Sequence, residues 1–199
     1  WLMSLDAHWY STIFGVYFFG GGLLTVLAAI TLIAVIFRKK GILDDTITIE
    51  HYHDMGKLMF AFTVFWGYIA FSQYFLIWYA NIPEETVWYQ DRWQGGWKYI
   101  TLLIVFGHFL IPFLGLMIRA AKRNMVWLTS LSVWILLMHW FDLYWLVFPT
   151  HSPEGAHFSW MDLTLFAGIG GIFFWFFWRQ LAAHPLVPVS DQRLLFSLK

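Results

Sequence analysis

The sequence has no cysteine and very little charge. Without cysteine the chain forms no disulfide, holds no iron–sulfur cluster through thiolates and attaches no haem through a C-x-x-C-H motif. Only 12% of its 199 residues are Asp, Glu, Lys or Arg, whereas about a quarter are charged in an average soluble domain. The formal net charge is zero, which removes the electrostatic argument for a nucleic-acid partner.

Apolar residues take the place of the missing charge. Hydrophobic residues make up 60% of the chain and aromatic residues 22%. So little polar side-chain surface cannot cover a water-soluble globule, and we expect lipid to be the solvent. Five apolar runs of about 20 residues are long enough to cross a bilayer. They cover approximately residues 12–37, 58–80, 99–118, 125–147 and 161–178.

These runs are predicted to be helices rather than strands. A membrane strand needs only about 9–11 residues of alternating polarity, and no such alternation is present in the runs. In lipid a segment must satisfy its own backbone hydrogen bonds, which a helix does alone. The sequence therefore predicts an all-α, polytopic membrane helix bundle over residues 1–185 and a cytoplasmic tail over residues 186–199.

The basic residues predict how the chain crosses the membrane. Lysine and arginine collect in cytoplasmic connections, so their distribution sets the orientation. One side of the five runs carries only Arg92 and Lys98, and we place that side and the N-terminus outside. The C-terminus is then cytoplasmic. The ten basic residues on the cytoplasmic side are Arg38, Lys39, Lys40, Lys57, Arg119, Lys122, Arg123, Arg179, Arg193 and Lys199.

The connections and glycines support this arrangement. The outer loop NIPEETVWYQDRWQGGWKY is rich in Trp and Tyr, which favour the headgroup level. The outer loop FPTHSPEGAHFSW is hydrophilic enough to contact a partner. Gly15, Gly20, Gly21 and Gly22 fit the close approach of helices that small residues permit in membranes.

Several polar residues lie deep inside the apolar runs. At about 1.5 Å per residue, they fall into one layer in the outer half of the bilayer. His139 and Asp142 are three residues apart and share a helix face. A carboxylate in hydrocarbon costs several kcal/mol unless it is paired or hydrated, so Asp142 is typical of an ion or proton pathway. The layer contains Ser72, Gln73, His108, His139 and Asp142.

A second polar group lies at the inner end of the second run. There the string HYHDMGK places His53 and Asp54 beside His51 and Lys57, and the hydroxyl of Tyr68 lies between this mouth and the deeper layer. The two groups predict a proton half-channel, although a purely structural scaffold with a His–Asp pair fits equally well. The candidates for the proton path are His53, Asp54, Tyr68, Ser72, Gln73, His108, His139 and Asp142.

Two cofactor alternatives remain open from the residues alone. His108 and His139 lie at similar depth and would serve as axial ligands if the chain were a haem-b electron carrier, although Met138 and Trp140 are bulky neighbours. The two histidines and the aspartate of HYHD would be a small metal site at the membrane surface. The sequence contains no H-E-x-x-H motif and no Ser/His/Asp arrangement with an activated nucleophile.

Three strings together resemble one known family. They are SLDAHWYSTIFGVYFFGGG, HYHDMGKLMFAFTVFWGYIAFSQYFLIWYANIPEET and HWFDLYWLVFP, and the likeness extends over about residues 4–185. The family is the F subunit of bacterial alternative complex III, an NrfD-like membrane subunit of the polysulfide-reductase type. Its members have about ten helices in two bundles. The resemblance, together with a first residue that is Trp rather than Met, implies that the later half is present here.

The resemblance also implies a role. Such a chain is a non-catalytic, haem-free subunit of a menaquinol-oxidising complex in a respiratory or photosynthetic chain of the bacterial cytoplasmic membrane. It scaffolds the complex and conducts protons, here through His53 and Asp54 and then His139 and Asp142. No cofactor or metal is expected in the chain itself. Menaquinone, iron–sulfur clusters and c-type haems are expected in partners: the NrfD-like C subunit, an iron–sulfur subunit and c-type cytochrome subunits.

Overall fold

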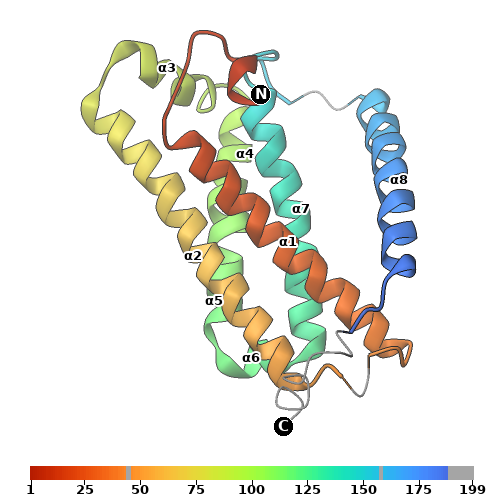
Figure 1. Cartoon of the computed structure of the whole chain (residues 1–199). Coiled ribbons are helices and arrows are strands. Elements are labelled where there is room, and N and C mark those ends of the chain that lie inside the picture. Colours follow the sequence, from red (N-terminus) through yellow and green to blue (C-terminus); the bar gives the residue numbers. More distant parts are fainter. Residues whose placement is uncertain (44–45, 157–158, 188–199) are drawn as a thin grey trace. The chain divides into compact units, whose positions relative to one another are not determined.

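The computed structural model describes residues 1–43, 46–156 and 159–187. In those residues the chain is all-α and contains no strand (Figure 1). Five helices are long and apolar enough to cross a membrane, which confirms the predicted fold class. The spans are Phe14–Lys39, Ile49–Ala80, Trp97–Met117, Met125–Val147 and Trp160–Ala183.

The chain forms two compact units, Trp1–Ala156 and His157–Lys199. The second unit contains α8 (Trp160–Ala183), which begins at a capping box: Ser159 donates its N–H to Asp162 Oδ2 at 2.8 Å. No residue of α8 is buried. Most of the predicted tail lies outside the described residues, including the two basic residues Arg193 and Lys199.

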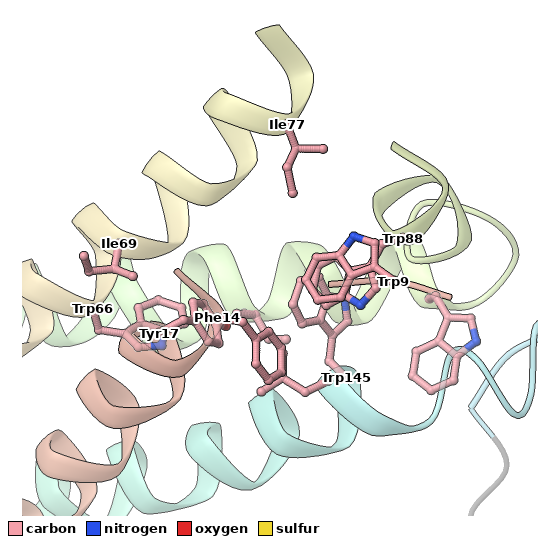
Figure 2. Packing of buried hydrophobic residues seen from close by; sticks show 11 residues of the cluster. Trp9, Phe14, Tyr17, Trp66, Ile69, Ile77, Trp88 and Trp145 are labelled. Carbon is pink, nitrogen blue, oxygen red and sulfur yellow. The ribbon is translucent and has the colours of Figure 1, made fainter. Parts of the chain in front are cut away.

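In the first unit, α1 (Phe14–Lys39) packs against both α2 (Ile49–Ala80) and α7 (Met125–Val147). Gly20 makes part of this close approach possible, because a Cβ there would lie 3.2 Å from the Phe65 ring of α2. Two buried clusters hold the helices together. The aromatic cluster comprises Trp9, Phe14, Tyr17, Trp66, Ile69, Ile77, Trp88, Trp97, Ile104, Trp145 and Leu146 (Figure 2). The aliphatic cluster comprises Leu24, Ala28, Val35, Tyr52, Met59, Leu116, Leu128, Leu131 and Ile135.

Helix α2 begins earlier than the apolar run predicts. It starts at Ile49, whereas the run begins near residue 58. His51 explains the difference: its ring Nδ1 accepts the backbone N–H of Thr48 at 3.2 Å, and this bond caps the helix. The polar mouth is therefore the first two turns of a membrane-length helix rather than a loop in front of it.

The third span is a helix with a π-helical middle. It consists of α4 (Trp97–Leu103), the π segment η2 (Ile104–Leu110) and α5 (Ile111–Met117). At the end of η2 the N–H of Ile111 bonds to the carbonyl of Phe106, five residues earlier. Such widened turns often occur at functional sites, and this one carries His108.

Pro112 explains why the span widens. Proline has no N–H, so in an α-helix it would leave the carbonyl of His108, four residues earlier, without a donor. With π spacing the carbonyl opposite Pro112 is that of Gly107, five residues earlier. The indole N–H of Trp134 donates to this Gly107 carbonyl at 2.8 Å. The missing backbone donor is therefore replaced by a side chain of α7.

The connection between α2 and α4 contains a short helix, α3 (Pro83–Asp91), and then Arg92, which is 1% exposed. Arg92 closes the C-terminal end of α7: Nε donates to the carbonyl of Trp145 at 3.2 Å and Nη2 to that of Leu146 at 2.9 Å. Nη1 donates to the carbonyl of Trp88 at 2.9 Å. Burial lowers the pKa of Arg92 to about 9, so the group stays charged at neutral pH and suits a helix C-terminus.

Lys122 closes a second helix end in the same way. It lies on α6 (Arg119–Arg123) and donates Nζ to the carbonyls of Leu116 at 2.6 Å and Met117 at 3.3 Å, at the end of α5. Gly56 of α2 packs on its side chain, since a Cβ there would lie 3.0 Å from Lys122 Cγ. A buried cation thus ends each of α5 and α7.

Candidate functional site

Four titratable side chains from three membrane helices meet in one buried group. Tyr17 of α1 donates its hydroxyl hydrogen bond to Asp142 Oδ1 of α7. One turn earlier on α7, His139 Nδ1 lies 3.6 Å from Asp142 Oδ2. The ring of His108 from η2 lies 5.7 Å from the His139 ring, centroid to centroid, with 28° between the planes. None of the four is more than 7% exposed.

The side chains of α2 close the group on another side. The Trp66 indole meets the His108 ring edge to face, with ring centroids 4.2 Å apart. The Trp66 ring also lies near the Tyr17 ring (Figure 2), at 5.4 Å between centroids. Gln73 is seven residues further along α2, on the same buried face, and is 2% exposed. We call the five residues that these contacts join, together with Gln73, the polar cluster: Tyr17, Trp66, Gln73, His108, His139 and Asp142.

Many polar atoms of the polar cluster have no hydrogen-bond partner among the described residues. Leaving a buried donor or acceptor unpaired costs about 1–3 kcal/mol. The 3.6 Å between His139 Nδ1 and Asp142 Oδ2 is an ion-pair distance but too long for a hydrogen bond. The unpaired atoms are Trp66 Nε1, Gln73 Oε1, His108 Nδ1, His108 Nε2, His139 Nδ1 and Asp142 Oδ2.

Gly21 determines how closely His139 approaches α1. A Cβ at residue 21 would lie 2.8 Å from His139 Cε1 and 3.3 Å from Trp66 Cδ1. The neighbouring Gly22 has no described atom within 4 Å of the same position. Gly21 therefore leaves space for the His139 ring of the polar cluster, whereas Gly22 contacts nothing that a side chain would displace.

This difference gives a matched test. We expect Gly21→Ala to displace the His139 ring and to destabilise the protein by about 1–3 kcal/mol, because the added methyl overpacks a filled site. Gly22→Ala should leave the stability unchanged or slightly higher. Thermal unfolding of both variants in the same detergent is the measurement. Equal melting temperatures for the two variants would show that residue 21 does not position His139.

Two predicted candidates on α2 lie away from the polar cluster. Tyr68 is 65% exposed, and Ser72 lines a surface groove beside it. Tyr68 and Ser72 do not face the polar cluster because the buried residues of α2 in this region recur every three or four positions. That spacing leaves positions 68 and 72 on another face of the helix. These buried residues are Trp66, Ile69, Gln73 and Ile77.

The predicted inner mouth lies at the other end of α2. Asp54 Oδ1 is 2.7 Å from Lys57 Nζ, and His53 Nδ1 is 4.0 Å from Glu50 Oε2. Glu50 also meets Arg123 at 2.7 Å. At 1.5 Å per residue, Asp54 is about 18 Å along the helix axis from Trp66. The structure therefore keeps the mouth and the polar cluster apart.

The packing around the two histidines bears on the haem alternative. A bis-histidine haem needs a flat cavity for its macrocycle between two facing imidazoles. Here Trp66 lies against His108, Gly21 lies against His139, and a Cβ on Gly107 would be only 2.5 Å from Met138 Sδ. Protein atoms thus fill the surroundings of both rings, and the described structure does not favour a haem there.

The metal alternative at HYHD finds no support either. Among the described residues, no group of three or more His, Cys, Asp or Glu side chains is close enough to hold a metal ion. The ring Nδ1 of His51 accepts the backbone N–H of Thr48, and this bond caps α2. The two remaining members, His53 and Asp54, approach each other to 3.9 Å.

Sequence reasoning missed three important side chains. Tyr17 gave no signal, because a tyrosine near the start of an apolar run reads as an interfacial anchor. Trp66 was one of many aromatic residues in its run. Arg92 was noted only as a charge, although Trp88 lies one helical turn earlier and an arginine is attracted to the face of a tryptophan ring; its guanidinium lies 3.5 Å from the Trp88 ring centroid.

Comparison with known proteins does not identify this arrangement. No protein-family model matches the sequence, and no curated protein matches it. The chain is a multi-pass helical membrane protein with a buried titratable cluster.

Proposed function

We propose that the polar cluster transfers protons within the membrane. The observation that carries this proposal is the burial of a tyrosine, an aspartate and two histidines in one contact group. Ionisable residues inside membranes are costly and commonly belong to proton or ion pathways.

The chemistry follows from the contacts. Tyr17 occupies Asp142 Oδ1, which leaves Oδ2 facing His139 Nδ1. A proton on His139 Nδ1 passes to Asp142 Oδ2 through one bridging water, or when the two atoms close from 3.6 Å to hydrogen-bond distance, and the transfer neutralises an imidazolium and a carboxylate together. The stacked ring of His108 is the next titratable group beside His139. No bond other than N–H and O–H changes in this exchange.

The wider assignment rests on the resemblance of the sequence. We infer that the chain is a non-catalytic, haem-free membrane subunit of a menaquinol-oxidising complex like alternative complex III. The likeness of the three strings supports this inference, and so does the absence of cysteine, which suits a chain whose redox centres belong to partners. The partners would be an NrfD-like C subunit, an iron–sulfur subunit and c-type cytochrome subunits in the bacterial cytoplasmic membrane.

A spectrum tests the wider assignment. The chain is purified through a tag from its native membranes, with its partners and then alone after dissociation. We expect the dithionite-reduced complex to show the α-band of c-type haem and to oxidise a menaquinol analogue, and the isolated chain to show no α-band. A band in the isolated chain would instead make His108 and His139 haem ligands, and a complex without c-type haem would refute the proposed family.

A further inference from the structure

The indole of Trp134 on α7 is hydrogen-bonded to the backbone next to His108. Its Nε1 donates to the carbonyl of Gly107 at 2.8 Å. That carbonyl and the N–H of His108 belong to one peptide unit, and a peptide unit is planar. The bond from Trp134 therefore fixes the plane from which the backbone of His108 continues.

The third span has no backbone N–H to spare for the Gly107 carbonyl. In an α-helix the donor would be the N–H of Ile111, but here that N–H bonds to the carbonyl of Phe106. In a π-helix the donor would be residue 112, which is a proline and has no N–H. Trp134 thus supplies from α7 a donor that both kinds of helical spacing would otherwise take from the span itself.

Helix α7 holds the same stretch at two further points. A Cβ on Gly107 would lie only 2.5 Å from Met138 Sδ, so α7 passes directly against this backbone one turn after Trp134. At the next position of each helix, the rings of His108 and His139 stack with their centroids 5.7 Å apart. The backbone and the ring of His108 therefore both lie against side chains of α7.

A second tryptophan of α7 provides the comparison. Trp127 lies about two turns before Trp134 and donates its Nε1 to the carbonyl of Gly115 at 3.0 Å, in the same span. Gly115 is near the end of α5, where carbonyls lack helical donors, and it is seven residues beyond His108. Either tryptophan would serve to tie the two helices together, but only Trp134 bonds to the peptide unit of His108.

We propose that Trp134 is a positioning residue, whose N–H holds the widened turn so that the His108 ring stays beside His139. Without this donor, the Gly107 carbonyl regains a partner only if the N–H of Ile111 moves to it from Phe106. That exchange converts π spacing to α spacing and rotates His108 relative to α7, because the two helices differ in residues per turn. The inference rests on the proposed proton transfer, since it assigns Trp134 a part in that transfer although the indole takes up no proton itself.

Nitrogen NMR of the histidine rings tests the positioning directly. The full chain carries ¹⁵N-histidine in lipid bilayers, and the His108 signals are assigned by their loss in His108→Gln. We expect these signals to shift in Trp134→Phe and to keep their wild-type positions in Trp127→Phe, although each variant removes one indole donor from one glycine carbonyl. A benzothienylalanine at position 134, which keeps the bicyclic ring and replaces the N–H by sulfur, should shift them as well. Wild-type signals in that variant would overturn the proposal, as would equal shifts in Trp134→Phe and Trp127→Phe.

Proton uptake by proteoliposomes that contain the reconstituted complex tests the functional part. We expect Trp134→Phe to take up protons about fivefold more slowly, the factor that the loss of one ordinary hydrogen bond allows, and Trp127→Phe to match the wild type. If Asp142→Asn kept wild-type uptake, the proposed proton transfer would fail, and the NMR comparison would still decide whether Trp134 positions His108. If Asp142→Asn stopped uptake while Trp134→Phe kept the wild-type rate, the role of Trp134 would be refuted and proton transfer would stand.

Discussion

Replacing Asp142 with asparagine is expected to stop proton movement through the chain while the fold persists. Asparagine has the same shape, and its amide oxygen still accepts the hydrogen bond of the Tyr17 hydroxyl. It cannot take up a proton, however, and positioned acid–base groups contribute about 10²–10⁴-fold to proton transfer. We therefore expect proton uptake by Asp142→Asn to fall about 100-fold. A pH-sensitive dye inside proteoliposomes that contain the reconstituted complex measures this uptake.

Two further variants make the result specific. Glu84→Gln removes an exposed carboxylate from α3 and should leave proton uptake unchanged. Tyr17→Phe keeps the carboxylate but removes its donor, and we expect an intermediate loss. Wild-type uptake by Asp142→Asn, in a complex of normal size and subunit content, would mean that the polar cluster only joins helices.

The second large effect concerns stability, at Arg92. We expect Arg92→Ala to destabilise the protein by on the order of 4 kcal/mol, because three carbonyls lose their donor and each unpaired buried acceptor costs about 1–3 kcal/mol. Arg92→Lys keeps the charge but not the planar fork that reaches three carbonyls, so about half of that loss should remain. Unfolding by denaturant in mild detergent measures both values.

Lys98 provides the control for this cation. It is the second residue of α4, its side chain is exposed, and its ammonium lies 5.8 Å from the Trp93 ring centroid. Lys98→Ala should change the free energy of unfolding by no more than about 0.5 kcal/mol. If Arg92→Ala and Lys98→Ala unfolded alike, the capping contacts of Arg92 would contribute little to the fold.

Length and polarity were sufficient to predict the helices. The end of α2 and both ends of α7 agree with the apolar runs, because a bilayer requires a helix of a certain length and little else. The start of α2 was predicted near residue 58, nine residues after its actual start at residue 49, because the first turns of the helix are polar. The polar first turn is helical because it is capped, and the capping residue is His51, which the sequence showed only as a member of the polar mouth.

The candidate site was predictable where the signal was local. His139 and Asp142 are one turn apart on one helix, and their contact follows from spacing alone. The bond from Tyr17 to Asp142 joins residues 125 positions apart, and no local pattern reveals such a pair. Ser72 was grouped with Gln73 by depth, and Tyr68 was placed between that layer and the inner mouth. Depth fixes a position along the bilayer normal, but it does not say which face of the helix a residue occupies.

The π segment has a consequence for the direction in which side chains project. An α-helix turns by about 100° per residue, and a widened turn that accommodates one extra residue shifts everything after it by about that angle. Side chains of α5 therefore project about a quarter-turn away from where an uninterrupted count from α4 would put them. Leu116 is fully buried in this shifted frame. Removing one residue from Ile104–Leu110 would reverse the shift and rotate α5 relative to α4, so the number of residues in this span determines which of them face α2 and α7.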